Sequence, residues 1–195
     1  MKILTITDYG IYIMSPLIMD SFLKSENIKS NKLLNYFQKN HDKYLLSLKY
    51  GIWIPVLPID SISYLISLDI DIFDNSWEKS FEYGPFNLEV GTDNSIWIGS
   101  FGNLLTWRRK EYTNTKDNLT YTTWDDKIYH KAFRFEKNSG KYNVTISGYR
   151  KKQDLSQINH GFLFTLVEVK DFVDYNDPRE NDKYYFNKLS YPDIS

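Results

Sequence analysis

Carboxylates alternate with aromatic residues between residues 69 and 82, where residue types and spacing come closest to a binding chemistry. The carboxylates belong to Asp69, Asp71, Asp74, Glu78 and Glu82, and the rings to Phe73, Trp77 and Phe81. Carboxylates steer a basic partner towards a surface, and aromatic side chains supply the desolvated contacts that dominate interface energies. We therefore predict a partner-binding acidic stretch made of Asp69, Asp71, Asp74, Trp77, Glu78 and Glu82. The plain alternative is an acidic loop before a strand.

Two basic runs, each preceded by an aromatic residue, form a second candidate surface. Its members are Trp107, Arg108, Arg109 and Lys110 in one run, and Tyr149 and Arg150 in the other. Charge next to stacking rings is typical of surfaces that bind single-stranded nucleic acid. A domain committed to nucleic acid is usually basic overall, whereas this chain has a pI of about 6.3. We therefore expect solvated strand ends here and no nucleic-acid binding.

Metal-binding and catalytic motifs are absent from the sequence. His41, His130 and His160 are far apart and share no metal-binding spacing, and there is no cysteine. The run Asp69–Asp74 lacks the central Gly and terminal Glu of a calcium loop. No Gly-rich phosphate loop and no Gly-x-Ser-x-Gly elbow occurs. We predict no metal, no cofactor and no catalytic activity.

Charge is segregated along the chain although the net charge is only −1. The formal charge is +3 for residues 1–52, −7 for residues 53–100, +7 for residues 101–152 and −4 for residues 153–195. Neighbouring strands of opposite sign would neutralise one another across a sheet. Alternatively, folding gathers one sign into a patch that steers a charged partner.

The length of 195 residues suits one domain with a core that needs no disulfides. We predict a single domain over residues 1–195. The N-terminal residues lack the apolar run and cleavage site of a signal peptide. No stretch approaches the roughly 20 apolar residues of a membrane-spanning helix. We expect a cytoplasmic protein with no membrane segment.

Residues 1–43 differ in pattern from the rest of the chain. Alternation predicts a strand pair over Ile3–Met14 with a turn near Asp8. Ser15 followed by Pro16 predicts a helix start, and apolar spacing predicts a second helix over Ser30–Asn40. These residues should form a strand pair followed by short helices.

The pattern of residues 44–190 predicts antiparallel strands with turns every 8–12 residues. Three hairpins are predicted, joining Tyr44–Leu48 to Ile52–Val56, Phe86–Val90 to Ile96–Ile98, and Phe133–Phe135 to Tyr142–Ile146. Ser61–Leu68 is favoured as a strand over a helix, and Phe162–Val169 forms a further strand. The predicted fold class is α+β, mainly β: an antiparallel β-sandwich or barrel with short N-terminal helices packed on it.

Aromatic residues make up 17% of the chain and divide by strand phase. Those in clear alternation are predicted to be core, namely Trp53, Phe86, Trp97, Phe133, Phe135, Tyr142, Phe162 and Phe164. Those beside charges or in turns are candidates for display, namely Trp77, Trp107, Trp124 and Tyr149. The aromatic content is therefore mainly a folding signal with a smaller binding signal.

The segment Asn138–Tyr149 is similar to the Gly-x-Tyr-x-Val hairpin found late in several antidote proteins and in the competence nuclease inhibitor family. More broadly, a small chain that lacks cysteine and has charge-segregated β structure resembles the immunity proteins of polymorphic-toxin and contact-dependent inhibition systems. The resemblance implies a cytoplasmic, stoichiometric inhibitor whose function is binding, and it transfers no site residues.

From these observations we expect an immunity protein that neutralises a cognate toxin domain, a nuclease, by covering its active site. It would act as a monomer or weak homodimer. A carbohydrate- or small-ligand-binding β-sandwich, with exposed Trp or Tyr as stacking platforms, is the second hypothesis, and an enzyme is the third.

Overall fold

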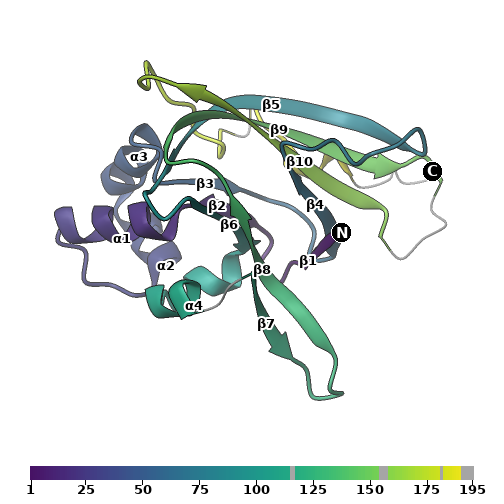
Figure 1. The fold of residues 1–195 in the computed structure, drawn as a ribbon, viewed down its shortest axis with the longest axis horizontal. Helices are drawn as coiled ribbons and strands as arrows, with labels where there is room; N and C mark the ends of the chain where they lie inside the picture. Colours follow the sequence, from purple (N-terminus) through teal and green to yellow (C-terminus); the bar gives the residue numbers. More distant parts are fainter. Residues whose placement is uncertain (115–116, 154–157, 181, 190–195) are drawn as a thin grey trace.

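The computed structural model describes residues 1–114, 117–153, 158–180 and 182–189, and within them two five-stranded sheets pack face to face (Figure 1). Sheet A contains, in spatial order, β1 (Lys2–Thr5), β4 (Ser63–Leu68), β10 (His160–Val169), β9 (Gly140–Lys151) and β5 (Trp77–Val90). Sheet B contains β3 (Trp53–Val56), β2 (Ile11–Met14), β6 (Ser95–Ser100), β8 (Ile128–Glu136) and β7 (Asn118–Thr122). All neighbours are antiparallel except β4 and β10. The predicted mainly-β α+β class is confirmed, as a sandwich and not as a closed barrel.

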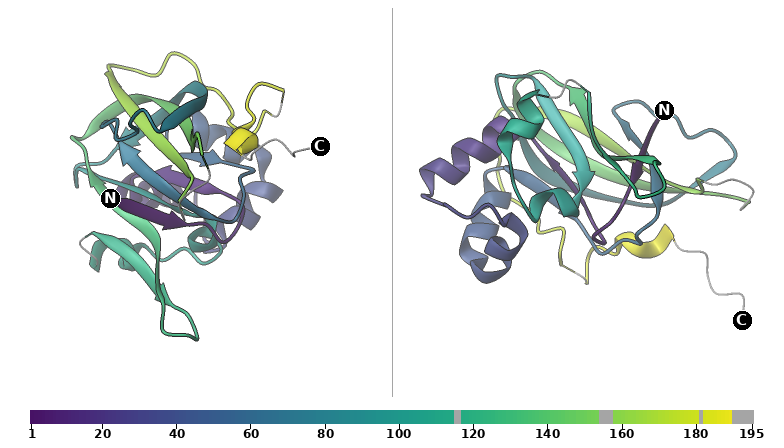
Figure 2. Two further views of the ribbon diagram at one scale, coloured as in Figure 1. Left: turned by 90° about the vertical axis from the view of Figure 1, so that its right-hand side faces the viewer. Right: turned by 90° about the horizontal axis from the view of Figure 1, so that it is seen from below.

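Short helices form a third layer at one end of the sandwich (Figure 2). They are α1 (Pro16–Ser25), α2 (Leu33–Lys39), α3 (His41–Lys49) and α4 (Arg109–Asn114), with 3₁₀ turns η1 (Phe101–Leu104) and η2 (Phe186–Leu189). As predicted, Ser15 precedes α1 and Pro16 occupies its first turn. None of the described helices is long and apolar enough to cross a membrane.

The β3, β2 and β6 strands of sheet B are buried on both faces because the sandwich core lies on one side of them and the helices lie on the other. Along β2, Ile11 and Ile13 point into the core between the sheets. Tyr12 and Met14, which alternate with them, point into the second core beneath the helices. Every residue of β2 is consequently buried, and the strand reads as a continuous apolar run.

The prediction of a strand over residues 44–48 was wrong, because this segment lies in helix α3. Tyr44, Ser47 and Leu48 are buried at helical spacing against the second core. The Ser47 hydroxyl accepts a hydrogen bond from the Trp53 indole N–H at 2.9 Å. Strand β3 pairs with β2, and the segment before it is helix α3 and not the first arm of a hairpin.

The other two predicted hairpins were wrong in their pairing, although their strands exist. β5 pairs with β9 and β6 pairs with β2 and β8, so the turn between β5 and β6 crosses from one sheet to the other. The turn between β8 and β9 makes the same crossing. The two crossing turns bind each other, since the Asn94 side chain accepts a hydrogen bond from the Ser139 N–H at 2.8 Å. The N-terminal strand pair is likewise split, with β1 in sheet A and β2 in sheet B.

A glycine on the inner face of sheet A makes room for an aromatic core. Gly148 on β9 lies opposite Phe81 on β5 and Phe162 on β10. A Cβ at Gly148 would lie 2.4 Å from the Phe81 ring. The two rings, with centroids 6.2 Å apart, fill the space that a side chain would otherwise occupy.

The segment after β10 returns along the sandwich and completes its core. Tyr184 and Phe186 are buried among the core residues of sheet A, and Phe186 is fully buried. The segment is tied down at two points: the Asn87 side chain donates to the Asp174 carbonyl at 2.8 Å, and the Tyr44 hydroxyl donates to Asp177 at 2.5 Å. We call residues 171–180 and 182–189 the C-terminal strap.

We expect Gly148→Ala to lower the free energy of unfolding by about 1–3 kcal/mol, because the added methyl overpacks the site against Phe81. Urea denaturation of Gly148→Ala, Phe81→Leu and the double variant measures the effect. The double variant should be more stable than the sum of the single effects implies. Simple additivity would show that the two positions do not compete for the same space.

Candidate functional site

The predicted acidic stretch lies in the loop between β4 and β5 and along the first half of β5. Its strand part runs beside the basic end of β9, with Trp77 opposite Lys151 and Glu78 opposite Arg150. Parts of the negative and positive segments of the sequence are therefore neighbours in sheet A, where opposite charges on adjacent strands neutralise each other.

Three of the carboxylates in this stretch are paired with cations of the same chain. Glu78 pairs with Arg150, and Glu82 pairs with Lys79 at 2.6 Å. Asp69, at a backbone φ of +58°, accepts the Leu166 N–H at 2.7 Å and pairs with Lys137 at 2.5 Å. These carboxylates hold strands and loops together, which leaves less uncompensated charge for a partner.

Asp71 and Asp74 shape the exposed loop. The Asp71 carboxylate accepts the Phe73 N–H at 2.9 Å, and the Asp74 carboxylate accepts the Ser76 N–H at 2.8 Å. The Ser76 hydroxyl also donates to Asp74, and these hydrogen bonds lower the pKa of Asp74. Asp71 and Asp74 therefore each form an Asx turn, in which the side-chain oxygen takes the place of a backbone carbonyl.

The aromatic rings of the loop pack on the outer face of sheet A. Phe73 stacks on Tyr149 with ring centroids 4.1 Å apart and planes 6° apart. Trp77 meets Phe73 edge-on at 5.0 Å, and the Lys151 amine lies 4.8 Å from the Trp77 ring centroid. Tyr149 is only 7% exposed, so the prediction that it is displayed was wrong.

The predicted basic and aromatic surface does not exist as one patch. Tyr149 and Arg150 belong to the acidic cluster on sheet A, while Trp107, Arg108, Arg109 and Lys110 lie at α4. Trp107 is 8% exposed and packs in the second core against Tyr112, so its predicted display was also wrong. Arg109 pairs with Asp20 at 2.5 Å, and Arg108 with Glu111 at 3.7 Å.

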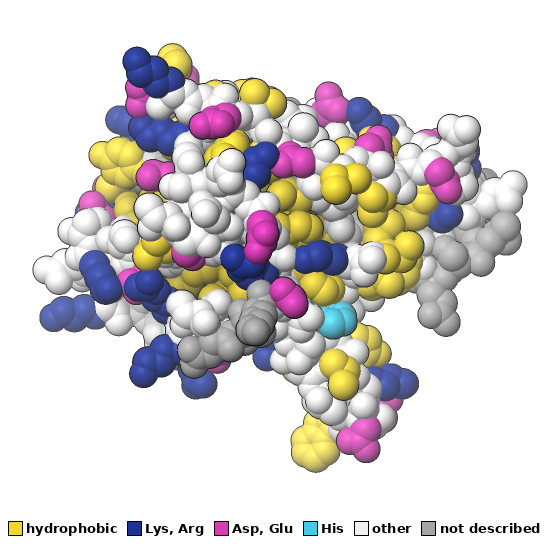
Figure 3. All heavy atoms as spheres, viewed as in Figure 1, with side chains coloured by type: hydrophobic (Ala, Val, Ile, Leu, Met, Phe, Trp, Pro, Cys, Tyr) yellow, Lys and Arg dark blue, Asp and Glu magenta, His cyan; other side chains and the backbone are white. Residues whose placement is uncertain are grey.

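Among the described residues, the most exposed aromatic side chain lies at the end of the β7–β8 hairpin. This hairpin leaves the body of the molecule, and hydrophobic and charged side chains gather at its end (Figures 1 and 3). Its loop is closed by the Thr123 N–H, which donates to the Lys127 carbonyl at 2.9 Å, and Asp126 has a φ of +57°. A three-residue loop with its last residue in the left-handed region is a common hairpin geometry.

Trp124 stands in this loop with its side chain fully exposed. Asp125 and Asp126 follow it, and Asp125 accepts a hydrogen bond from the Thr123 hydroxyl and pairs with Lys127 at 2.7 Å. The prediction that Trp124 could be displayed is confirmed. The tip thus combines an aromatic ring with carboxylates, the combination that the acidic stretch was predicted to provide. We call residues 123–127 the hairpin tip.

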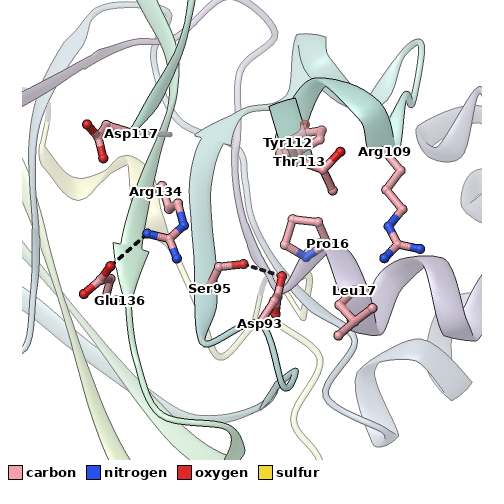
Figure 4. Close-up of a pocket in the computed structure, with 10 residues that line it drawn as sticks. All are labelled: Pro16, Leu17, Asp93, Ser95, Arg109, Tyr112, Thr113, Asp117, Arg134 and Glu136. Carbon is pink, nitrogen blue, oxygen red and sulfur yellow. Dashed lines mark hydrogen bonds and ion pairs between the residues drawn. The ribbon is translucent and has the colours of Figure 1, made fainter. Parts of the chain in front are cut away.

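A cleft of about 470 Å³ opens between α1, α4 and the base of the β7–β8 hairpin (Figure 4). Arg109 of α4 and Arg134 of β8 enter it from different walls. Arg134 pairs with Glu136 at 3.1 Å, and the Ser95 hydroxyl donates to Asp93 at 2.7 Å. Both charge signs therefore line the cleft. Its residues come from five separate segments, so no motif in the sequence indicates it.

The floor of the cleft is fixed by a pair of buried tyrosines. Tyr112 lines the cleft, and its hydroxyl is hydrogen bonded to that of Tyr12 at 2.8 Å. The Asn103 side chain donates to the Tyr12 hydroxyl at 3.2 Å. Burial raises the pKa of both phenols, so both remain neutral donors and acceptors at neutral pH. These tyrosines hold α4 against sheet B.

In the described ranges, no three His, Asp or Glu side chains are grouped so that they could hold a metal ion. The three histidines belong to different elements, α3, β8 and β10. No protein-family model, curated protein or solved structure matches this chain.

We expect Asp69→Ala to lower the free energy of unfolding by about 1–3 kcal/mol, because it leaves the half-buried Leu166 N–H without its acceptor. Asp69→Asn is the matched control, since Asn keeps an acceptor oxygen and tolerates the positive φ. Urea denaturation should show the smaller loss for Asn. Equal losses would assign the effect to the Lys137 ion pair instead.

Proposed function

We propose that this protein is an immunity protein that binds a toxin domain, a nuclease, and blocks its active site with the hairpin tip. The observation that carries the proposal is Trp124, fully exposed at the end of a hairpin that leaves the body of the molecule. The proposal places the protein in the cytoplasm and assigns it no catalytic activity of its own.

An exposed Trp at a protruding tip suits insertion into a concave surface. Trp buries roughly 150–250 Å² when it is covered, and it is among the residues most often found as interface hot spots. The hairpin that carries it is held by the strand pairing of β7 with β8. Binding therefore restricts little additional backbone freedom, and its entropic cost is small. A tip of this kind reaches into a cleft that a flat sheet face does not enter.

The charge of the tip fits the proposed partner. Phosphate-binding surfaces are rich in Lys and Arg. Asp125 and Asp126 would therefore be attracted by the cleft in which a nuclease binds its substrate. Within the described part of the chain, Asp126 forms no ion pair, so its charge is available to a partner.

The acidic stretch contributes less in this arrangement than the sequence indicated. Its Asp69, Glu78 and Glu82 carboxylates are paired with cations of the same chain. The remaining contact area would come from the sides of the hairpin, where Ile128 is 66% exposed. A stable complex would bury roughly 1,200–2,000 Å² in total.

We expect Trp124→Ala to weaken binding to the product of the neighbouring reading frame by about 30-fold or more, as for a hot-spot residue. Co-expression of the two proteins, followed by affinity measurement on the purified pair, tests this. Val173→Ala is the matched control, because Val173 is equally exposed but lies on the C-terminal strap. A neighbouring product that is harmless when expressed alone contradicts the proposal.

Charge reversal in the same assay locates the electrostatic contribution. Asp125→Lys/Asp126→Lys should slow association at low salt by about tenfold or more, because steering acts on the association rate. Asp71→Lys/Asp74→Lys, at the site indicated by the sequence, should slow it less. The reverse order would move the interface to the acidic stretch.

A second candidate function, binding of a small ligand that carries both charge signs, is favoured by the cleft that contains Arg109 and Arg134. We expect such a ligand to raise the thermal midpoint of the wild type by about 2 °C or more through mass action. The same compounds should not stabilise Arg134→Met. A screen of amino acids, nucleotides and simple sugars that stabilises neither protein would reject this function.

A further inference from the structure

Three of the four edge strands of the sandwich are covered within the described residues. Strand β1 lies against β8, where the Lys2 amine donates to the Arg134 carbonyl and lies 4.0 Å from the Phe135 ring centroid. Strand β3 is buried along its whole length and contains Pro55, which has no N–H to offer. Both devices are typical ways of protecting an edge from further pairing.

Strand β5 is covered by the C-terminal strap and by the α3–β3 turn. The Asn176 side chain donates to the Pro85 carbonyl at 2.9 Å, and the Glu89 N–H donates to the Gly51 carbonyl at 2.7 Å. Two register shifts further interrupt its edge. An additional strand cannot pair along the second half of β5 without displacing these contacts. The first half carries the charged side chains of Glu78, Lys79 and Glu82, which oppose further pairing at an edge.

Strand β7 is the fourth edge, and its outer backbone groups are open. The Arg134 N–H donates to the Asp117 carbonyl at 2.8 Å, and the Thr123 N–H donates to the Lys127 carbonyl, so residues 117 and 123 face β8. Because this orientation alternates along an antiparallel strand, residue 121 also faces β8 and residues 120 and 122 face outward. Thr120 and Thr122 are exposed, and no described residue bonds to their outward N–H and C=O groups.

The side chains of β7 do not protect this edge. The strand Asn118–Thr122 contains neither Pro nor a charged residue. Thr and Tyr are strong strand formers. On one face, Tyr121 stacks on Tyr129 of β8 with ring centroids 5.6 Å apart. Figures 1 and 2 show that the outer part of the hairpin stands clear of the body.

We infer that β7 is a self-association edge that pairs antiparallel with β7 of a second copy of this chain. The pairing is centred on Tyr121, with Thr120 opposite Thr122 of the second copy, and the reciprocal pair on the other side. All outward groups of Thr120 and Thr122 are then satisfied by four backbone hydrogen bonds. The two sheets B become one continuous ten-stranded sheet.

A second copy is the occupant because the edge is complementary to itself. Tyr121 meets Tyr121 of the second copy as a cross-strand aromatic pair, which extends the stack already present with Tyr129. No like charges face each other in this register. Since the other three edges are covered, pairing closes at two copies and forms an isologous dimer.

The short strand sets the strength of this dimer. Only the outer part of β7 contributes, so the interface is well below the roughly 1,200 Å² of stable complexes, and dimers should appear at concentrations on the order of 100 μM. The dimer uses the edge of β7, whereas the proposed toxin binding depends mainly on the hairpin tip.

The test is sedimentation velocity of the full chain from about 10 μM to 1 mM, a range chosen around that concentration. Thr120→Lys/Thr122→Lys should remain monomeric, because like charges face each other in both pairs. Thr120→Lys/Thr122→Glu should dimerise at least as well as the wild type, because opposite charges face each other. The measurement uses the purified chain alone, with no toxin present, so its outcome separates this inference from the proposed function.

A wild type that stays monomeric to 1 mM would overturn the inference, and so would dimerisation of the Lys/Lys variant. Loss of dimerisation in the Lys/Glu variant would overturn the register, because a pairing of Thr120 with Thr120 places like charges opposite each other. If the wild type is monomeric and the Lys/Lys variant no longer binds the product of the neighbouring reading frame, the edge of β7 pairs with a strand of that protein instead of with a second copy. The far-ultraviolet circular dichroism of both variants should match that of the wild type, since their side chains point into solvent.

Discussion

The burial of both faces of strands β3, β2 and β6 in sheet B is the constraint on which the rest of the structure depends. A sheet that carries apolar residues at every position of β2 cannot leave either side in water. One side is covered by sheet A, and the other requires the helices. The placement of α1 to α4, the cleft beside α4 and the base of the β7–β8 hairpin all follow from covering that second face.

The sequence predicted elements better than it predicted their partners. Alternation correctly located β6 and β10, β-branched content correctly favoured a strand at β4, and the Ser15–Pro16 pair located the start of α1. It could not distinguish a hairpin from a turn that crosses between sheets, because both consist of two alternating strands around a short polar loop. In a crossing turn the residues on both sides point into the same core, as Leu88 and Ile96 do, and this relation depends on the whole sandwich. Helix α3 was missed because its Leu-rich run also fits a buried strand.

The predictions of which side chains are displayed were wrong for Trp107 and Tyr149 and confirmed for Trp124, for related reasons. Charge runs are visible in a sequence, but the counter-charges that neutralise them come from distant residues, as Arg150 does for Glu78. Trp107 and Tyr149 stand next to charges in the sequence and are nevertheless buried, because a strand or helix end turns neighbouring side chains in different directions. Trp124 was identified because a turn leaves its residues with no layer to pack against. The cleft could not be predicted, since five segments meet there only after folding.

The C-terminal strap is also needed to complete the folded core of sheet A. Phe186 packs against Phe81, more than 100 residues earlier in the chain, and Tyr184 packs against Phe86. The aromatic interior of sheet A is therefore complete only once Tyr184 and Phe186 have packed into it. A chain without these two residues would leave parts of Phe81 and Phe86 uncovered, the kind of surface that chaperones bind and that promotes aggregation. Closure of the sandwich thus depends on the last described residues of the chain.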